Sequence, residues 1–93
     1  MNTEFEIIEK EVIESLHFPN TDVLEDEEEI QQRNSELQRA LSLGNLEHLK
    51  IQIFFEDDQS KKVVDTTVWG VTDKRVILKK GVYIPINRIY KSI

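Results

Sequence analysis

The sequence of 93 residues has no cysteine, which excludes a disulfide framework, a thiol nucleophile and a zinc–thiolate site. It has two histidines, His17 and His48, and neither lies in a spacing typical of metal ligands. Its three glycines stand apart from one another, so the chain has no glycine-rich loop to bind a phosphate group. Because the sequence contains no recognisable nucleophile, acid–base pair or metal cluster, we expect a protein that is not an enzyme and that binds neither cofactor nor metal.

Long apolar runs are missing as well. No stretch approaches the roughly 18 apolar residues that a membrane span needs. The first residues, up to Glu4, are acidic where a signal peptide would be basic. The formal net charge of −6 disfavours non-specific coating of DNA. We therefore expect a cytoplasmic protein that does not bind a membrane.

The charges divide the chain into an acidic first third and a basic last third. Residues 1–30 carry eleven Asp and Glu against one base, whereas residues 61–93 carry eight Lys and Arg against two acids. The β-branched residues Val, Ile and Thr follow the same division, with eight in residues 1–45 and sixteen in residues 46–93. The first half of the chain therefore predicts helices and the second half predicts strands.

Two helices are expected in the acidic half. Apolar residues at spacings of three, four and four predict a first helix that ends before Pro19, with one apolar face made of Phe5, Ile8, Val12 and Leu16. A second helix is expected to begin near Asp22 to Glu25, where acids favour the positive helix end, and to run to Leu43. Gly44-Asn45 then predicts a left-handed stop.

Short strands are expected after residue 45. Leu49, Ile51, Ile53 and Phe55 alternate with more polar residues, which is typical of a half-buried strand. Gly70 predicts a bulge or bend in the following strand, and Trp69 is expected to anchor the core. We therefore predict a single α+β folding unit: an acidic helical segment over 1–45, followed over 46–93 by a strongly bent, four- to five-stranded antiparallel barrel of the Sm-like or SH3-like kind.

The order of the predicted segments after the helix resembles that of the Sm-like barrel. The segments that carry this resemblance are Leu49 to Phe55, Trp69-Gly70-Val71, Val76 to Lys79 and Ile84 to Ile89. The resemblance covers about residues 35–93, and the family includes the bacterial host-factor RNA chaperones and, more distantly, the Rho-binding antiterminators. This chain has Asp57-Asp58-Gln59-Ser60 where the family usually has Gly, and Lys74-Arg75 where it has Asn. Those positions help to form the family's uridine pocket, so the resemblance implies the barrel without that pocket.

Five basic residues are candidate contacts for single-stranded RNA: Lys74, Arg75, Lys79, Lys80 and Arg88. They fall on predicted turns and strand ends, so several can share one barrel rim with Trp69 or Tyr83 nearby. Charge neutralisation combined with aromatic stacking is how small barrels bind single strands. The alternative is that these bases solvate the edges and prevent edge-to-edge aggregation.

The acidic half also has two interpretations. Its acids form either a solvated helix face or a surface that mimics a phosphate backbone. Such a surface either lies over the chain's own basic rim and suppresses RNA binding, or docks on a basic partner protein. The apolar face of the first helix, Phe5, Ile8, Val12 and Leu16, either packs on the rest of the chain or serves as a docking or dimerisation helix. We predict a non-enzymatic binding or regulatory module that acts on a protein partner or by self-association, in transcription as the antiterminator resemblance implies. The alternative is an RNA-binding barrel that uses the five bases.

Overall fold

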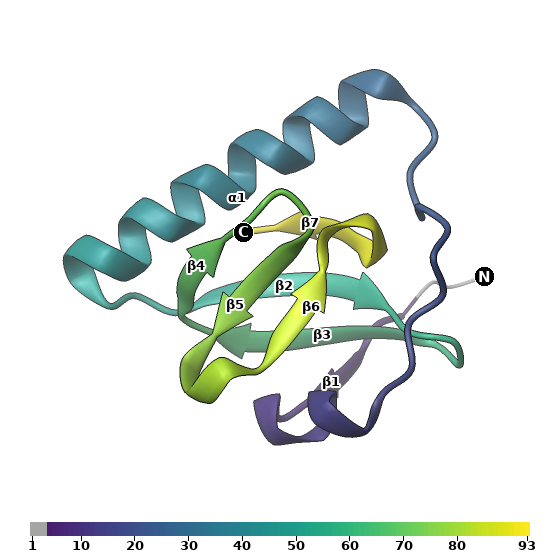
Figure 1. Ribbon diagram of the computed structural model, residues 1–93, viewed down its shortest axis with the longest axis horizontal. Coiled ribbons are helices and arrows are strands. Elements are labelled where there is room, and N and C mark those ends of the chain that lie inside the picture. Colours follow the sequence, from purple (N-terminus) through teal and green to yellow (C-terminus); the bar gives the residue numbers. More distant parts are fainter. Residues whose placement is uncertain (1–3) are drawn as a thin grey trace.

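The computed structural model describes residues 4–93 and shows an α+β fold, in which one long helix lies beside two small β-sheets (Figure 1). The larger sheet has the strand order β1-β3-β2-β7 and the smaller sheet has the order β4-β5-β6. The strands are β1 (Glu6–Ile8), β2 (Ile51–Glu56), β3 (Lys61–Thr66), β4 (Val68–Val71), β5 (Arg75–Leu78), β6 (Tyr83–Pro85) and β7 (Ile89–Ser92). The helices are α1 (Glu27–Glu47) and the short 3-10 helices η1 (Lys10–Ser15), η2 (Lys79–Gly81) and η3 (Ile86–Arg88). Within residues 4–93, no helix combines the length and the apolar composition that crossing a bilayer requires.

The predicted α+β class is confirmed, but the predicted order of N-terminal helices followed by a four- to five-stranded barrel is wrong, because the strands form two sheets that do not close. β3 leads into β4 across the single residue Thr67, so the chain bends from one sheet into the other. The register of β4 against β5 shifts between Val68 and Gly70, which is the irregularity expected near this glycine. β6 ends at Pro85, which has no N–H to donate to a ladder, and η3 separates it from β7. The two sheets therefore stay open between β6 and β7.

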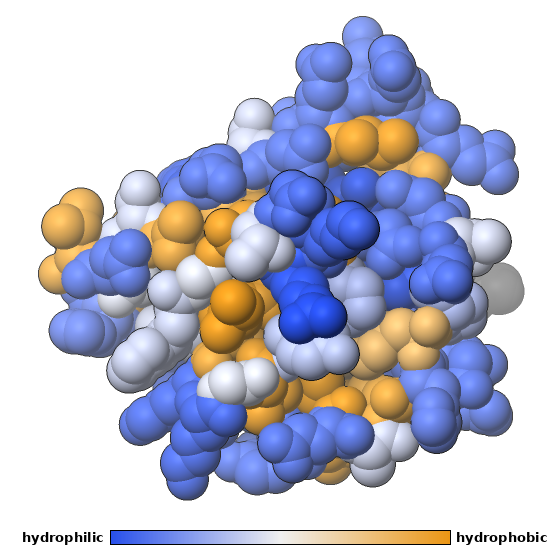
Figure 2. Space-filling model, in the orientation of Figure 1, coloured by the Kyte–Doolittle hydropathy of each residue, from blue (hydrophilic) through white to orange (hydrophobic). Residues whose placement is uncertain are grey.

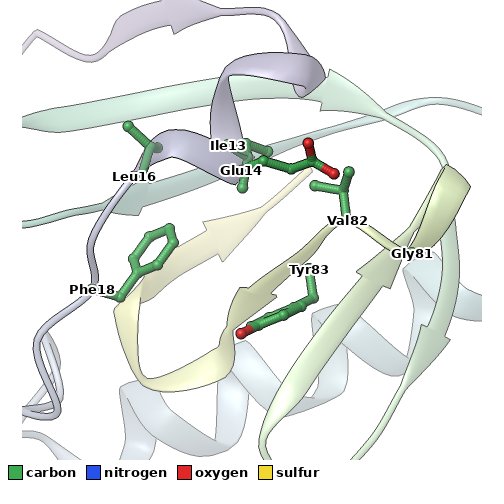
Figure 3. Close-up of a pocket in the computed structure, with 7 residues that line it drawn as sticks. All are labelled: Ile13, Glu14, Leu16, Phe18, Gly81, Val82 and Tyr83. Atoms are coloured by element: carbon green, nitrogen blue, oxygen red, sulfur yellow. The ribbon is translucent and has the colours of Figure 1, made fainter.

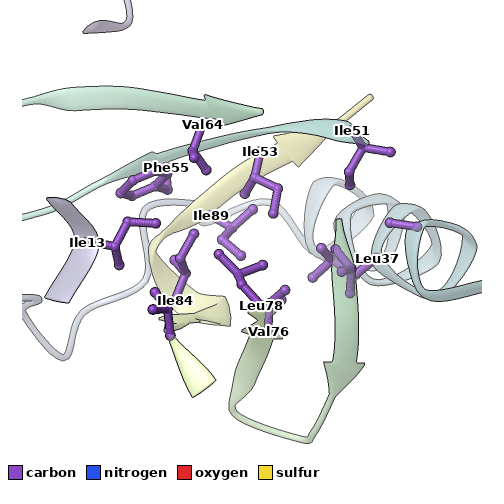
Figure 4. Close-up of a cluster of buried hydrophobic side chains, with 13 residues drawn as sticks. Ile13, Leu37, Ile51, Ile53, Phe55, Val64, Val76, Leu78, Ile84 and Ile89 are labelled. Atoms are coloured by element: carbon purple, nitrogen blue, oxygen red, sulfur yellow. The ribbon is translucent and has the colours of Figure 1, made fainter. Parts of the chain in front are cut away.

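Buried side chains from both sheets and from α1 share one core (Figure 4). Along β2, Ile51, Ile53 and Phe55 are buried while Gln52 is exposed, which confirms the predicted alternation from Ile51 onwards. The prediction is wrong for Leu49, which precedes the strand and is 44% exposed. The other strands contribute the nearly inaccessible side chains of Val64, Val68, Val76, Leu78, Ile84 and Ile89.

The predicted helix near the N-terminus is wrong. Residues 6–8 form β1, which pairs in parallel with β3, and residues 10–15 form the 3-10 helix η1. β-branched Ile7, Ile8, Val12 and Ile13 suit this extended and tightly turned path better than an α-helix. Tertiary packing decides the rest, because Ile13 is 2% exposed and belongs to the core, although it lies outside the predicted apolar stripe.

α1 is the predicted second helix, with different ends. Asp26 caps its start by accepting a hydrogen bond from the Glu28 N–H at 3.2 Å. The predicted stop at Gly44 is wrong, because the helix continues to Glu47 and His48 adopts the left-handed conformation (φ 55°). Gly44 instead permits a close approach to β4: a Cβ atom at this position would lie 2.3 Å from the carbonyl oxygen of Val68.

Arg33 connects α1 to two other parts of the chain. Its side chain is 4% exposed, and its Nη1 and Nη2 each donate to the Asp22 carboxylate at 2.9 Å. Nη1 also donates to the carbonyl oxygen of Ile89 in β7 at 3.0 Å. Partial burial opposes ionisation of Asp22, but hydrogen bonds from Arg33 and from the Leu24 N–H, together with the Arg33 charge, lower its pKa.

The turn between β2 and β3 has a similar buried ion pair. Asp57 is 2% exposed and accepts hydrogen bonds from the Ser60 N–H at 3.0 Å, the Gln59 N–H at 3.1 Å and Lys62 Nζ at 3.0 Å. Burial again opposes ionisation, and these donors outweigh it, so the pKa of Asp57 is lowered. The carboxylate thus holds the turn in the position where the Sm-like family usually has glycine.

We predict that Gly44→Ala destabilises the fold by about 1 to 3 kcal/mol, because the added methyl group forces α1 away from β4. Thermal and urea unfolding followed by circular dichroism would measure the loss. Ser42→Ala, on an exposed position of the same helix, is the matched control and should be neutral or slightly stabilising. Equal stability of Gly44→Ala and the wild type would show that α1 does not approach β4 this closely.

We predict that Asp22→Asn costs about 1 to 3 kcal/mol near neutral pH, because it leaves a buried guanidinium with one partner fewer. The pKa of Asp22 is lowered by folding, so its contribution is present above the unfolded-state pKa and is lost as pH falls through the folded-state pKa. The stability gap between wild type and variant should therefore stay constant from about pH 7 to about pH 5 and shrink as the pH falls below about 4. Urea unfolding at several pH values measures this gap, and a gap independent of pH would contradict the ion pair.

Candidate protein-interaction site

Residues 25–32, which we call the acidic arm, include the start of α1 and project from the body of the molecule (Figure 1). Five consecutive acids, from Glu25 to Glu29, are all exposed, and Arg33 is the first buried residue of the helix. In Figure 2 the outermost part of the upper right of the molecule, where α1 begins in Figure 1, is hydrophilic, and a group of hydrophobic residues lies directly beneath it. The arm therefore presents a dense negative charge away from the core.

A groove runs beside the acidic arm between α1 and β7, and we call it the α1–β7 groove. It consists of two hollows of about 490 and 300 Å³, and both are lined by Gln32 and Glu36. Glu36 crosses the base of the groove, where its Oε1 accepts a hydrogen bond from the Ser92 N–H at 3.1 Å. Together with the hydrogen bond from Arg33 to Ile89, this contact covers the outer backbone edge of β7.

Three aromatic rings lie where the groove is closest to the acidic arm. Phe5 and Tyr90 line the groove there, and Phe54 lies beside Phe5. Phe5 packs edge-on against Phe54 and Tyr90, with ring centroids 5.1 and 5.7 Å apart. Lys61 Nζ lies 5.3 Å from the Tyr90 ring, and Lys91 Nζ lies 5.0 Å from the Phe54 ring. These lysines are therefore held against aromatic faces of their own chain, where the attraction between a cation and a ring favours them.

Tyr90 is fixed by a second contact, because its hydroxyl donates a hydrogen bond to Oε1 of Glu56. Partial burial of the phenol, this hydrogen bond and the negative charge of Glu56 raise the pKa of Tyr90 to about 12. The phenol is thus neutral at physiological pH, and its hydrogen bond to Glu56 fixes the position of the Tyr90 ring.

The predicted docking residues do not form one helical face. Phe5 packs on the aromatic rings, and Ile8 and Leu16 pack against the core, whereas Val12 is 41% exposed. Leu16 also lines a hollow of about 200 Å³ between η1 and β6, shown in Figure 3. The other residues around this hollow are Ile13, Glu14, Phe18, Gly81, Val82 and Tyr83. The N-terminal segment thus lies against the rest of the chain.

The five predicted basic contacts are not gathered on one rim. Lys74, in the turn before β5, and Arg75, the first residue of β5, are exposed, while Lys79 and Lys80 are exposed at the other end of the strand in η2. The Arg75 guanidinium carbon lies 4.3 Å from the centre of the Tyr83 ring.

Arg88 differs from the other four bases because it is 6% exposed. It donates from Nη1 to the Thr21 carbonyl at 2.7 Å and from Nε to the Glu56 carbonyl at 3.1 Å. Its side chain is therefore engaged in joining three parts of the chain.

A second polar groove surrounds Trp69, and we call it the Trp69 groove. Trp69 is 55% exposed, so the expectation that it anchors the core is wrong; in this β-strand Val68 points inward and Trp69 outward. The groove has a volume of about 440 Å³ and brings together bases that are far apart in the sequence: Lys10, His48, Lys50 and Lys79. It also contains the acids Glu9, Glu11 and Asp65, which balance part of that charge.

Sequence reasoning missed Arg33 and Glu36, which form the base of the α1–β7 groove. One signal was present: Arg33 stands four residues before Leu37 and seven before Ala40, within the buried stripe of the helix. A charged residue inside an apolar stripe indicates a buried ion pair, but its partner cannot be read from the spacing. Within the described part of the chain, no three His, Asp or Glu side chains lie together as metal ligands would.

No family model matches the chain, and neither the comparison with curated proteins nor the comparison with solved structures finds a match.

Proposed function

We propose that this chain is a non-enzymatic binding module that docks on a basic surface of a partner protein through the acidic arm. The observation that carries this proposal is the projection of Glu25 to Glu29 beyond the first buried residue of α1. Like charges in a row repel one another, and the positive end of the helix offsets only part of that repulsion. A basic partner would relieve the rest and would be steered towards the arm by the complementary charge.

The surroundings of the arm support this use. The nearby cations are engaged within the chain, since Arg33 pairs with Asp22 and Lys61 and Lys91 lie against aromatic rings. The arm's carboxylates thus remain accessible to an outside cation. The resemblance to Rho-binding antiterminators stays a prediction and adds transcription as the process in which such a partner is expected.

We predict that a random peptide library displayed on phage, selected on the immobilised chain, enriches sequences rich in Lys and Arg. Glu28→Lys combined with Glu29→Lys should abolish this enrichment, because it reverses the charge of the arm. The matched control combines Glu47→Lys with Asp73→Lys, two exposed acids outside the arm that give the same change in net charge. Enrichment without a basic bias, or equal enrichment by both double variants, would refute docking through the arm.

A second candidate function is binding of single-stranded RNA, and the Trp69 groove favours it. An exposed Trp with Lys50 and Lys79 in the same groove offers one stacking platform and two cations for phosphates. This arrangement uses Lys79 from the predicted set and brings in bases that the sequence does not point to. The three acids of the groove weaken its attraction for phosphate, so this function ranks second.

We predict that, if the chain binds RNA, Trp69→Ala weakens the affinity about fivefold or more, because the base loses its stacking partner. Lys50→Glu should have a comparable effect that diminishes at high salt. Fluorescence anisotropy with a labelled RNA of about 12 nucleotides and mixed sequence would measure both. Lys74→Glu is the control, and a larger effect there would move the binding site to the turn before β5. Absence of binding to the wild type would remove this function.

A further inference from the structure

The α1–β7 groove is continuous along the helix, because Gln32 and Glu36 line both of its hollows. One end lies beside the acidic arm, at Leu24 and Asp26, and the other lies beside Leu43 and Ile93. Its two ends differ in chemistry, so one linear ligand could contact an acidic surface and an apolar surface at the same time.

The acidic end is lined by Asp26, Glu28, Glu29 and Glu36. Three cations also line it, but Arg33 is bound to the Asp22 carboxylate and Lys61 and Lys91 lie over the rings of Tyr90 and Phe54. A lysine over a ring keeps its charge, so these four acids and Asp22 against the three cations leave a net charge of −2. This charge complements a Lys or Arg side chain rather than an acidic one.

The other end is lined by the apolar residues Ala40, Leu43, Ile51 and Ile93, and the exposed Arg39 lines it as well. We call it the apolar end. Ile93 is 69% exposed, which leaves a large aliphatic side chain at the mouth of the hollow. Ser92 lines the same hollow at 6% exposure, and its Oγ finds no hydrogen-bond partner within residues 4–93. A buried hydroxyl without a partner is costly, so a ligand group that reaches Ser92 Oγ gains a hydrogen bond that the described chain does not supply.

The way in which a ligand can lie here is restricted by β7. Arg33 and Glu36 already bond to the Ile89 carbonyl and to the Ser92 N–H on the outer edge of this strand. A segment in the groove therefore cannot simply extend the sheet as an added strand, and its side chains must provide most of the recognition.

We infer that the α1–β7 groove binds an extended segment of a partner polypeptide, with Lys or Arg residues at the acidic end and an aliphatic residue at the apolar end. This inference rests on the proposed function and specifies its partner. Glu29 and Leu43 are fourteen residues apart in α1, which corresponds to about 21 Å along the helix. An extended chain covers this distance in about six residues, so the basic and aliphatic residues of the ligand should be about six positions apart.

The test uses a fluorescein-labelled synthetic peptide with the pattern Arg-Lys-Arg, a spacer of about five Ser and Gly residues, and Leu-Ile, prepared in both directions along the chain. Fluorescence anisotropy would measure its affinity for the full chain. A second peptide lacks the spacer and so cannot reach both ends of the groove. We expect one direction of the long peptide to bind best. The short peptide should bind with an affinity at least about fivefold lower than that of the better long peptide.

Variants at each end separate the groove from the acidic arm. We expect Ile93→Ser and Leu43→Gln to weaken binding of the long peptide about fivefold or more, because each removes apolar contact at one end. Glu28→Lys with Glu29→Lys should reduce it further, while Glu47→Lys should leave it unchanged. Thermal melting checks that each variant folds. If Leu43→Gln does not fold, the test relies on Ile93→Ser, which changes an exposed side chain.

The outcomes distinguish the two proposals. If binding depends on Glu28 and Glu29 but not on Ile93, Leu43 or the spacer, the groove inference is overturned and docking through the arm stands. If binding depends on neither end, both are overturned. Light scattering adds one further outcome. If the mass rises with concentration in the wild type and not in Ile93→Ser, the groove is occupied by a second copy of this chain, and the inference of a partner polypeptide is overturned.

Discussion

The buried guanidinium of Arg33 determines where α1 lies. It joins three parts of the chain, because its donors reach the Asp22 carboxylate before the helix and the Ile89 carbonyl in β7. A guanidinium that is 4% exposed needs such partners, since an unpaired buried charge is strongly unfavourable. The helix therefore cannot slide along β7 without losing them. The placement of α1 beside β7, and with it the position of the acidic arm that precedes Arg33, depends on these contacts.

The same arrangement explains why the sheets remain open and why their edges are poorly suited to pairing with another chain. α1 covers the outer edge of β7 through Arg33 and Glu36, and Pro85 removes a donor from β6. Gly44 brings the other end of the helix close to the Val68 carbonyl in β4. At β6 and β7 a partner therefore meets side chains, including those of α1 and of the neighbouring groove, rather than a free strand edge.

Much of this fold could be predicted from local pattern, and the errors have physical causes. The alternation around Ile53, the long second helix and the irregularity near Gly70 depend on short-range periodicity, which the structure follows. The N-terminal segment has an equally clear helical spacing, yet pairing with β3 and burial of Ile13 override it. Of the candidate site, the acidic run was visible in the sequence. The groove was not, because it depends on which strand edge the helix covers.

The basic C-terminal third presents less positive charge at the surface than its sequence suggests, because some of its bases are buried and paired. The C-terminal third is basic in sequence, but Lys62 is 6% exposed and bound to Asp57, and Arg88 is 6% exposed and bound to backbone carbonyls. The remaining bases are divided between the two ends of β5 and the aromatic rings beside β7, so they do not add up to one positive surface. The acids of the arm have no such internal partners beyond the helix cap made by Asp26 within the described chain. A concentrated negative surface set against dispersed positive charge favours a basic protein segment over a nucleic acid as the partner.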